Sequence, residues 1–253
     1  MSEVSDAVRE RYAGLAGELG GSEGCCGSGE GDSCCPAGAY QPSELAEVGL
    51  NESVSLGCGN PTLLASLQPG EVVLDLGSGG GLDVLLSARR VGPKGHAYGI
   101  DMTDQMLELA ERNRTRAGVD NASFLKGTID RVPLPKESVD VVISNCVINL
   151  AEDKGAVLRE AYRVLRAGGR LAVADMVEVE PLAPEVKRAV DSWAGCIAGT
   201  IPITDYVALL VGAGFEEPEV EVHDVQSVPG GSGTVGSAYI RARKQGAVRG
   251  SEG

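Results

Sequence analysis

The run Asp75-Leu76-Gly77-Ser78-Gly79-Gly80-Gly81 joins an apolar segment, 72–74, to a helical pattern that begins at Leu82. Closely spaced glycines between a strand and a helix are typical of doubly wound α/β folds, where they open a nucleotide pocket. Glycine lets the backbone turn tightly and brings bare N–H groups against a ligand. This run therefore predicts a nucleotide-binding turn.

A second carboxylate supports the same interpretation. Asp101 lies twenty residues beyond Gly81, at the end of the apolar run 97–100, where it can accept both hydroxyls of a ribose. The glycines read G-x-G-x-G, whereas dinucleotide sites favour G-x-G-x-x-G and phosphate loops need a Lys followed by Ser or Thr. No such lysine follows, which argues against a triphosphate, and NAD is the weaker alternative. With Asp75 inside the strand, the motif resembles motif one of the S-adenosylmethionine methyltransferases.

The composition restricts the class of protein. A chain of 253 residues, 43% of them hydrophobic, can bury the core of one α/β domain with additions. A net charge of −14 and few aromatic residues argue against nucleic acid as a partner. No apolar stretch approaches the roughly 20 residues of a membrane span, and the N-terminus lacks a signal sequence. We therefore expect a cytoplasmic protein without a membrane partner, and we expect a monomer.

The seven cysteines pose a second question. In a reducing compartment they are not expected to form structural disulfides, and an odd number cannot pair completely. They could be inert core residues, a metal or metalloid site, or redox groups. None has C-x-x-C spacing, so we expect no structural metal. Two vicinal pairs, 25–26 and 34–35, lie in the stretch 20–38, which contains seven glycines and reads as a loop.

Apolar periodicity predicts strands that alternate with helices. The fold class expected is α/β, a doubly wound, Rossmann-like, mostly parallel sheet of seven strands with an N-terminal helix and loop. Seven strands, the last two without a helix between them, resemble the topology of class I methyltransferases. Strands are predicted at 71–76, 97–101, 122–125, 139–144, 170–176, 215–223 and 237–243, and helices at 3–19, 82–90, 104–117, 153–166, 184–198 and 204–212.

Four parts are expected along the chain. They are the N-terminal helix and Gly/Cys-rich loop at 1–57, the cofactor-binding core at 58–180, the rest of the core with its last two strands at 181–244, and a flexible tail at 245–253.

In such sheets, ligands bind at the carboxyl ends of the strands. We therefore expect four segments to share one crevice: the glycine turn, the end of the second strand, the segment after the third strand and the end of the fourth strand. The segment after the third strand could meet an adenine. The residues expected to bind the cofactor are Asp75, Gly77, Ser78, Gly79, Gly81, Asp101, Met102, Gly127, Thr128, Ile129 and Asn145.

Several further motifs resemble one family closely. Ser144-Asn145-Cys146-Val147-Ile148-Asn149-Leu150, Gly57-Cys58-Gly59 and Gly195-Cys196-Ile197-Ala198-Gly199 are similar to segments of the arsenite S-adenosylmethionine methyltransferases, and the likeness covers about residues 45 to 244. The resemblance implies S-adenosylmethionine as methyl donor and arsenite and methylarsenite as substrates.

The resemblance also implies roles for the cysteines. Trivalent arsenic is soft, so thiolates are the ligands to expect; Cys58, Cys146 and Cys196 are the three candidates. Cys34 or Cys35 could close a transient disulfide with Cys58, which a thiol reductant such as thioredoxin or glutathione would reopen. The vicinal pairs could instead only scavenge soft metals.

Two other functions stay open at the level of sequence. A small-molecule C- or O-methyltransferase, for example one acting on a quinone, would carry incidental cysteines. It would also want a general base near Asn145, but the only histidines are His96 and His223, and neither lies in a motif. A non-enzymatic, thiol-rich metalloid-binding protein would explain the cysteines but leave the predicted cofactor pocket without purpose.

Overall fold

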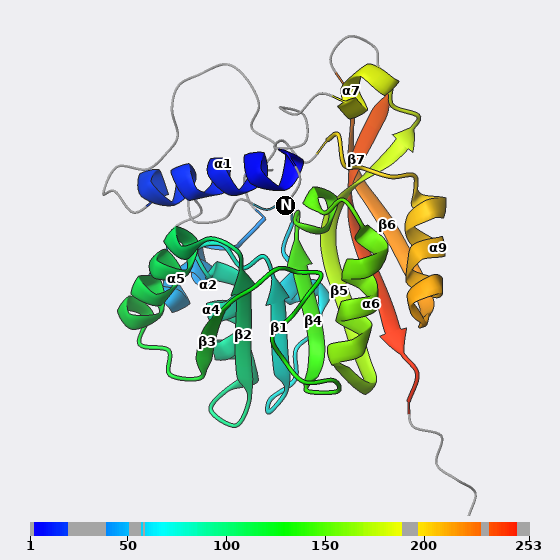
Figure 1. Ribbon diagram of the computed structural model, residues 1–253. Coiled ribbons are helices and arrows are strands. Elements are labelled where there is room, and N and C mark those ends of the chain that lie inside the picture. The colour runs from blue at the N-terminus through cyan, green and yellow to red at the C-terminus, as the bar shows by residue number, and fades with distance from the viewer. Residues whose placement is uncertain are drawn as a thin grey trace, which may run out of the picture.

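The computed structural model (Figure 1) describes residues 3–19, 39–50, 57, 59–188, 197–228 and 233–246. Its centre is one seven-stranded sheet in the order β3-β2-β1-β4-β5-β7-β6. The first five strands in this order are parallel, and β7 runs antiparallel to both of its neighbours. The strands are β1 Val72–Leu76, β2 His96–Asp101, β3 Ala122–Lys126, β4 Val139–Asn145, β5 Leu165–Glu180, β6 Phe215–Ser227 and β7 Thr234–Lys244. The predicted fold class is confirmed.

Helices cover both faces of the sheet. One face packs against α6 and α9, and the other against α2 and α4 (Figure 1). The helices are α1 Glu3–Leu19, α2 Pro42–Val48, α3 Pro61–Leu64, α4 Leu82–Val91, α5 Asp104–Ala117, α6 Lys154–Val164, α7 Pro184–Arg188 and α9 Ile203–Ala213, with a 3-10 turn, η2, at Ile148–Leu150. Strands that are buried on both faces explain the nearly continuous apolar runs of β1 and β4.

Several predicted boundaries differ from the structure. The helix predicted at 153–166 ends at Val164, and β5 begins at the next residue. The strand continues through the glycines at 168–169, and its pairing with β4 shifts register between Val139 and Val141. The short helices α2 and α3 were not predicted. Of the helix predicted at 184–198, the structure describes α7, and residues 189–196 lie outside the described part.

The first helix, α1, lies across the carboxyl edge of the sheet (Figure 1). It packs on α5 through a small apolar cluster of Ala16, Met106 and Leu109. Within the described ranges, no helix combines the length and the apolar character that crossing a membrane requires. The placement of α1 matters for the site, because the carboxyl edge is where a doubly wound sheet binds its ligands.

Candidate functional site

A cavity of about 730 Å³ opens at the carboxyl ends of β1, β2 and β4. The glycine turn after β1, the loops after β2 and β3, the end of β4 and the helix α1 form its walls. Ten of the eleven predicted cofactor residues line it: Asp75, Gly77, Ser78, Gly79, Asp101, Met102, Gly127, Thr128, Ile129 and Asn145. Gly81 is set back, since a Cβ atom there would lie 2.7 Å from Cζ of Phe124. Its lack of a side chain serves packing against β3.

The glycine turn is held in a conformation that other residues rarely adopt. Gly77 has φ +71°, and a Cβ atom on it would lie 2.4 Å from Val147 Cγ1. Gly79 has φ +49°, but the atom nearest to its Cβ position is Met106 Sδ, 4.0 Å away. Gly79 therefore faces open space in the cavity, and a side chain on it would take room from a ligand.

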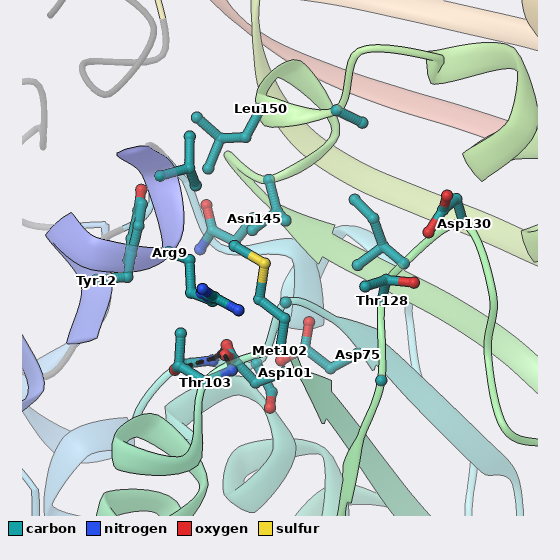
Figure 2. A pocket seen from close by; sticks show the side chains of 18 of the residues that line it. Arg9, Tyr12, Asp75, Asp101, Met102, Thr103, Thr128, Asp130, Asn145 and Leu150 are labelled. Atoms are coloured by element: carbon teal, nitrogen blue, oxygen red, sulfur yellow. Dashed lines mark hydrogen bonds between the residues drawn. The ribbon is translucent and has the colours of Figure 1, made fainter. Parts of the chain in front are cut away.

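The carboxylate of Asp101 joins the glycine turn after β1 to Thr103, which lies beside it in Figure 2. One oxygen accepts hydrogen bonds from the N–H (2.9 Å) and the hydroxyl (2.8 Å) of Thr103, and the other accepts from the N–H of Gly79 (3.1 Å). Burial raises the pKa of Asp101, while these hydrogen bonds oppose the rise. The predicted ribose acceptor thus lies in the cavity, fixed by short-range contacts.

A buried polar network lies beside this wall. The Tyr40 hydroxyl donates to the carboxylate of Asp83 (2.8 Å), and the Asn145 amide nitrogen donates to Tyr40 (3.0 Å), Asp83 (3.2 Å) and the carbonyl of Gly59 (2.8 Å). Burial, together with the nearby carboxylates of Asp83 and Asp101, raises the pKa of Asp75 well above its usual value. So many acidic groups around one cavity favour a ligand that carries positive charge.

Asp83 gives this network a pH dependence that can be measured. Burial raises its pKa from 3.8 to about 6, opposed by the hydrogen bonds from Tyr40 and Asn145. Because the folded protein holds this proton more tightly than the unfolded chain, the stabilising effect is full below pH 3.8 and is lost as pH rises through about 6. In the wild-type protein this group should lower the free energy of unfolding by up to about 3 kcal/mol as the pH rises across that window, and Asp83→Asn should abolish this contribution. Urea unfolding of both proteins at a series of pH values measures this, and identical slopes would contradict it.

Sequence reasoning missed several residues of the cavity. Val8, Arg9 and Tyr12 of α1 line it, and Figure 2 shows Arg9 extending from α1 into the space between Asn145 and Asp101. Apolar periodicity predicted α1 itself, but periodicity does not say which surface a helix covers. Tyr40 and Asp83 were also missed, because they lie 43 residues apart in the chain and meet only in the fold.

The cavity suits S-adenosylmethionine. At Gly79 the turn leaves open space, so a ligand can approach the backbone closely. The carboxylate of Asp101 lies in the cavity wall, where it can accept the hydroxyls of a ribose.

Comparisons with known proteins agree with this geometry. A family model described as "Methyltransferase domain" matches residues 67–228. The crystal structure of an arsenic(III) S-adenosylmethionine methyltransferase from Chlamydomonas reinhardtii superposes with a TM-score of 0.71 at 34% identity, over 81% of this chain and 75% of that one. The chain belongs to the arsenite methyltransferase family.

Curated sequences show the same relationship. Family members named arsenite methyltransferase from Halobacterium salinarum and Aquipseudomonas alcaligenes are 43% and 38% identical to this chain, over 88% and 74% of its length. The match covers 60% of the first protein and 57% of the second, so the chain spans less than two thirds of these curated relatives.

Of the cysteines that the family resemblance singles out, the structure describes Cys146. It follows β4 directly, is 4% exposed and has φ +56°, an uncommon conformation for a residue other than glycine. Its sulfur is disulfide-bonded, which differs from the free thiol expected from the sequence. Cys34, Cys35, Cys58 and Cys196 lie outside the described residues.

Described neighbours of Cys58 and Cys196 nevertheless lie against the region of Cys146. A Cβ atom on Gly57 would lie 2.0 Å from Asn145 Cγ, and the carbonyl of Gly59 accepts the hydrogen bond from Asn145. Ile197 packs on the apolar cluster that contains Cys146. The residues that flank Cys58 thus lie at the end of β4, and the residue that follows Cys196 packs on the cluster that contains Cys146.

Proposed function

We propose that the chain transfers methyl groups from S-adenosylmethionine to thiol-bound trivalent arsenic, in arsenite and in methylarsenite. The observation that carries this proposal is the convergence just described. Gly57 and Gly59 contact Asn145, which ends β4 and lines the cofactor cavity, and Ile197 packs on the apolar cluster that contains Cys146. In the sequence, Cys58 stands between Gly57 and Gly59, and Cys196 directly precedes Ile197. The family to which the chain belongs supports the same substrate.

The donor set suits arsenic as a substrate. Cys58, Cys146 and Cys196 would supply three thiolates, the soft ligands that a soft metalloid prefers. Arsenic held in this way keeps a lone pair and carries no proton, so the reaction needs no general base. Cys146 must first be reduced, because a sulfur in a disulfide bond cannot bind arsenic.

Residues of the cavity would hold the methyl donor. S-adenosylmethionine, when bound, supplies an electrophilic methyl group on a positively charged sulfur. Asp101 would accept the ribose hydroxyls, the turn 77–81 would approach the methionine part, and the segment Gly127-Thr128-Ile129 would meet the adenine. Positioning of the two substrates by these groups would supply most of the rate enhancement.

A redox step follows from electron balance. Methyl transfer formally oxidises trivalent arsenic to the pentavalent state, so a further round needs two electrons. Two thiols supply them when they close a disulfide, and thioredoxin or glutathione would return the electrons by thiol–disulfide exchange. We propose that Cys34 or Cys35 pairs with Cys58 in this step.

The double variant Cys34→Ser/Cys35→Ser tests the redox step. It should complete a first methyl transfer and then stall in steady state, because the electrons for the next round have no donor. The matched control is Cys25→Ser/Cys26→Ser, which removes the other vicinal pair. Normal turnover of the first variant, with thioredoxin as sole reductant, would mean that residues 34 and 35 only scavenge soft metals.

The remaining proposals concern setting and organisation. We propose that the protein acts as a monomer. Reductants of the thioredoxin or glutathione type support a cytoplasmic location. We keep the division into 1–57, 58–180, 181–244 and 245–253 as a proposal for the domain organisation.

One assay separates the proposed function from its alternatives. Radiolabelled S-adenosylmethionine is supplied with arsenite, with a demethylated quinone, or without an acceptor, each in the presence of a thiol reductant. The proposal expects label on arsenic alone. Label on the quinone would indicate a small-molecule methyltransferase, and arsenite binding without transfer would indicate a metalloid-binding protein.

A further inference from the structure

The turn between β4 and α6, residues 146–151, has two functional sides. Val147, Leu150 and Ala151 line the cofactor cavity. Cys146, at the start of the turn, packs instead into an apolar cluster with Met176 and Val235. The turn therefore carries the proposed arsenic ligand at its start and lines the cofactor cavity with its later residues. Its shape sets the separation between the two.

Three successive residues of β5 hold the first residue of this turn, Cys146, and a residue in its middle, Asn149. The N–H of Cys146 donates to the carbonyl of Ala174 (2.8 Å). The carboxylate of Asp175 accepts from the backbone N–H of Asn149 (3.2 Å) and from its side-chain amide (2.8 Å). The same amide also donates to the carbonyl of Met176 (2.6 Å). Asp175 and Asn149 are both fully buried, so no water competes for these contacts.

Lys154, at the start of α6, holds the other side of the turn. Its ammonium group donates to the carbonyls of Asn149 (3.2 Å) and Ala151 (3.0 Å), and the residue is 7% exposed. Burial lowers the pKa of Lys154 and raises that of Asp175 to about 7. Burying such groups is costly, and apolar residues would pack here at lower cost. Neither Asp175 nor Asn149 lines the cavity, so cofactor binding does not explain them.

We propose that Asp175 is a positioning residue: with Asn149 it fixes the turn 146–151 and so aligns the arsenic-binding thiolate of Cys146 with the methyl donor. This inference rests on the proposed function. The positive φ of Cys146 needs such support, because surrounding contacts must hold a residue in that conformation. Loosening the turn would misalign the two substrates while leaving the glycine turn and Asp101 in place.

Asp175→Asn is the direct test. The substitution keeps the size of the side chain but places an NH₂ group where one oxygen accepts from Asn149. The single-turnover rate of methyl transfer to arsenite should fall about 100-fold, as misplacement by about 1 Å can cause. The S-adenosylmethionine Kd should change little. Tyr206→Phe is the matched control, since this buried hydroxyl near Asp175 has no hydrogen-bond partner among the residues that the structure describes; it should keep both values.

A second readout does not depend on methyl transfer. With the other six cysteines replaced by serine, alkylation reports how tightly the turn holds the Cys146 thiol. Asp175→Asn should speed alkylation several-fold. Val84→Ala is the control for stability alone, because Val84 lies in the core cluster on the other face of the sheet. When the two variants are compared at the same unfolding free energy, Val84→Ala should not speed alkylation.

The outcomes separate this inference from the proposed function. A wild-type protein that methylates no arsenite contradicts the proposed function, and alkylation then decides the positioning role by itself. The positioning role is overturned if Asp175→Asn keeps the wild-type single-turnover rate and alkylation rate. It is also overturned if the rate falls only in proportion to a loss of cofactor affinity or of folded protein.

Discussion

Cys146→Ser should abolish methylation of both arsenite and methylarsenite. Serine has nearly the same size as cysteine, but its hydroxyl is a hard, neutral oxygen that binds trivalent arsenic poorly. Cys196→Ser should show the same loss, whereas Cys58→Ser should lose only the first methylation, because methylarsenite needs two thiolates rather than three. Product analysis by chromatography coupled to arsenic detection distinguishes these patterns.

The cofactor site provides the control for these variants. Since Cys146 packs into the apolar cluster and Asn145 lines the cavity, Cys146→Ser should bind S-adenosylmethionine with unchanged Kd. A Cys146→Ser protein that methylates arsenite at the wild-type rate would refute the assignment of this residue as an arsenic ligand.

Asp101→Ala should weaken S-adenosylmethionine binding through lost hydrogen bonds to a charged group. Each such bond contributes about 1.5–3 kcal/mol, so the loss of even one should raise the Kd by a factor of about 10 to 150. The alanine also releases the N–H groups of Gly79 and Thr103, which adds to the effect. Calorimetry measures the Kd directly.

Two further variants serve as a surface control and as a more severe change in the same cavity. Asp104→Ala removes a carboxylate three residues away that pairs with Lys126 at the surface, and it should leave the fold and the melting temperature nearly unchanged. Gly79→Val should fail more completely than Asp101→Ala, because it combines φ +49° with a side chain inside the cavity. Unchanged cofactor affinity in Asp101→Ala would show that this carboxylate does not hold the ribose.

Much of the cavity could be predicted because its residues follow local rules. The glycine turn after β1, Asp101 after β2 and Asn145 at the end of β4 each end a strand of a parallel sheet. The carboxyl ends of parallel strands meet at one edge of such a sheet, so the position of these residues at strand ends was enough to predict that they lie close together. Residue 81 was the exception, because a glycine can serve packing as well as ligand approach.

Other features depend on contacts between distant segments. Asp83 reads as an ordinary acidic residue in the first turn of a helix, and only the fold places Tyr40 and Asn145 on its carboxylate. Asp175 reads as one polar residue within an apolar strand, and its partner Asn149 belongs to a turn whose shape no local pattern specifies. Sequence periodicity identifies elements, whereas side-chain networks between elements need the tertiary arrangement.

The central claim is methyl transfer to thiol-bound arsenic in the cavity formed at the carboxyl edge of the sheet. A single-turnover experiment tests it most directly: reduced protein carrying one equivalent of arsenite is mixed with methyl-labelled S-adenosylmethionine and quenched. The account predicts label on arsenic, at a stoichiometry approaching one methyl group per protein, and none after Cys146→Ser. Arsenic recovered entirely without label, from protein that has bound both substrates, would contradict it.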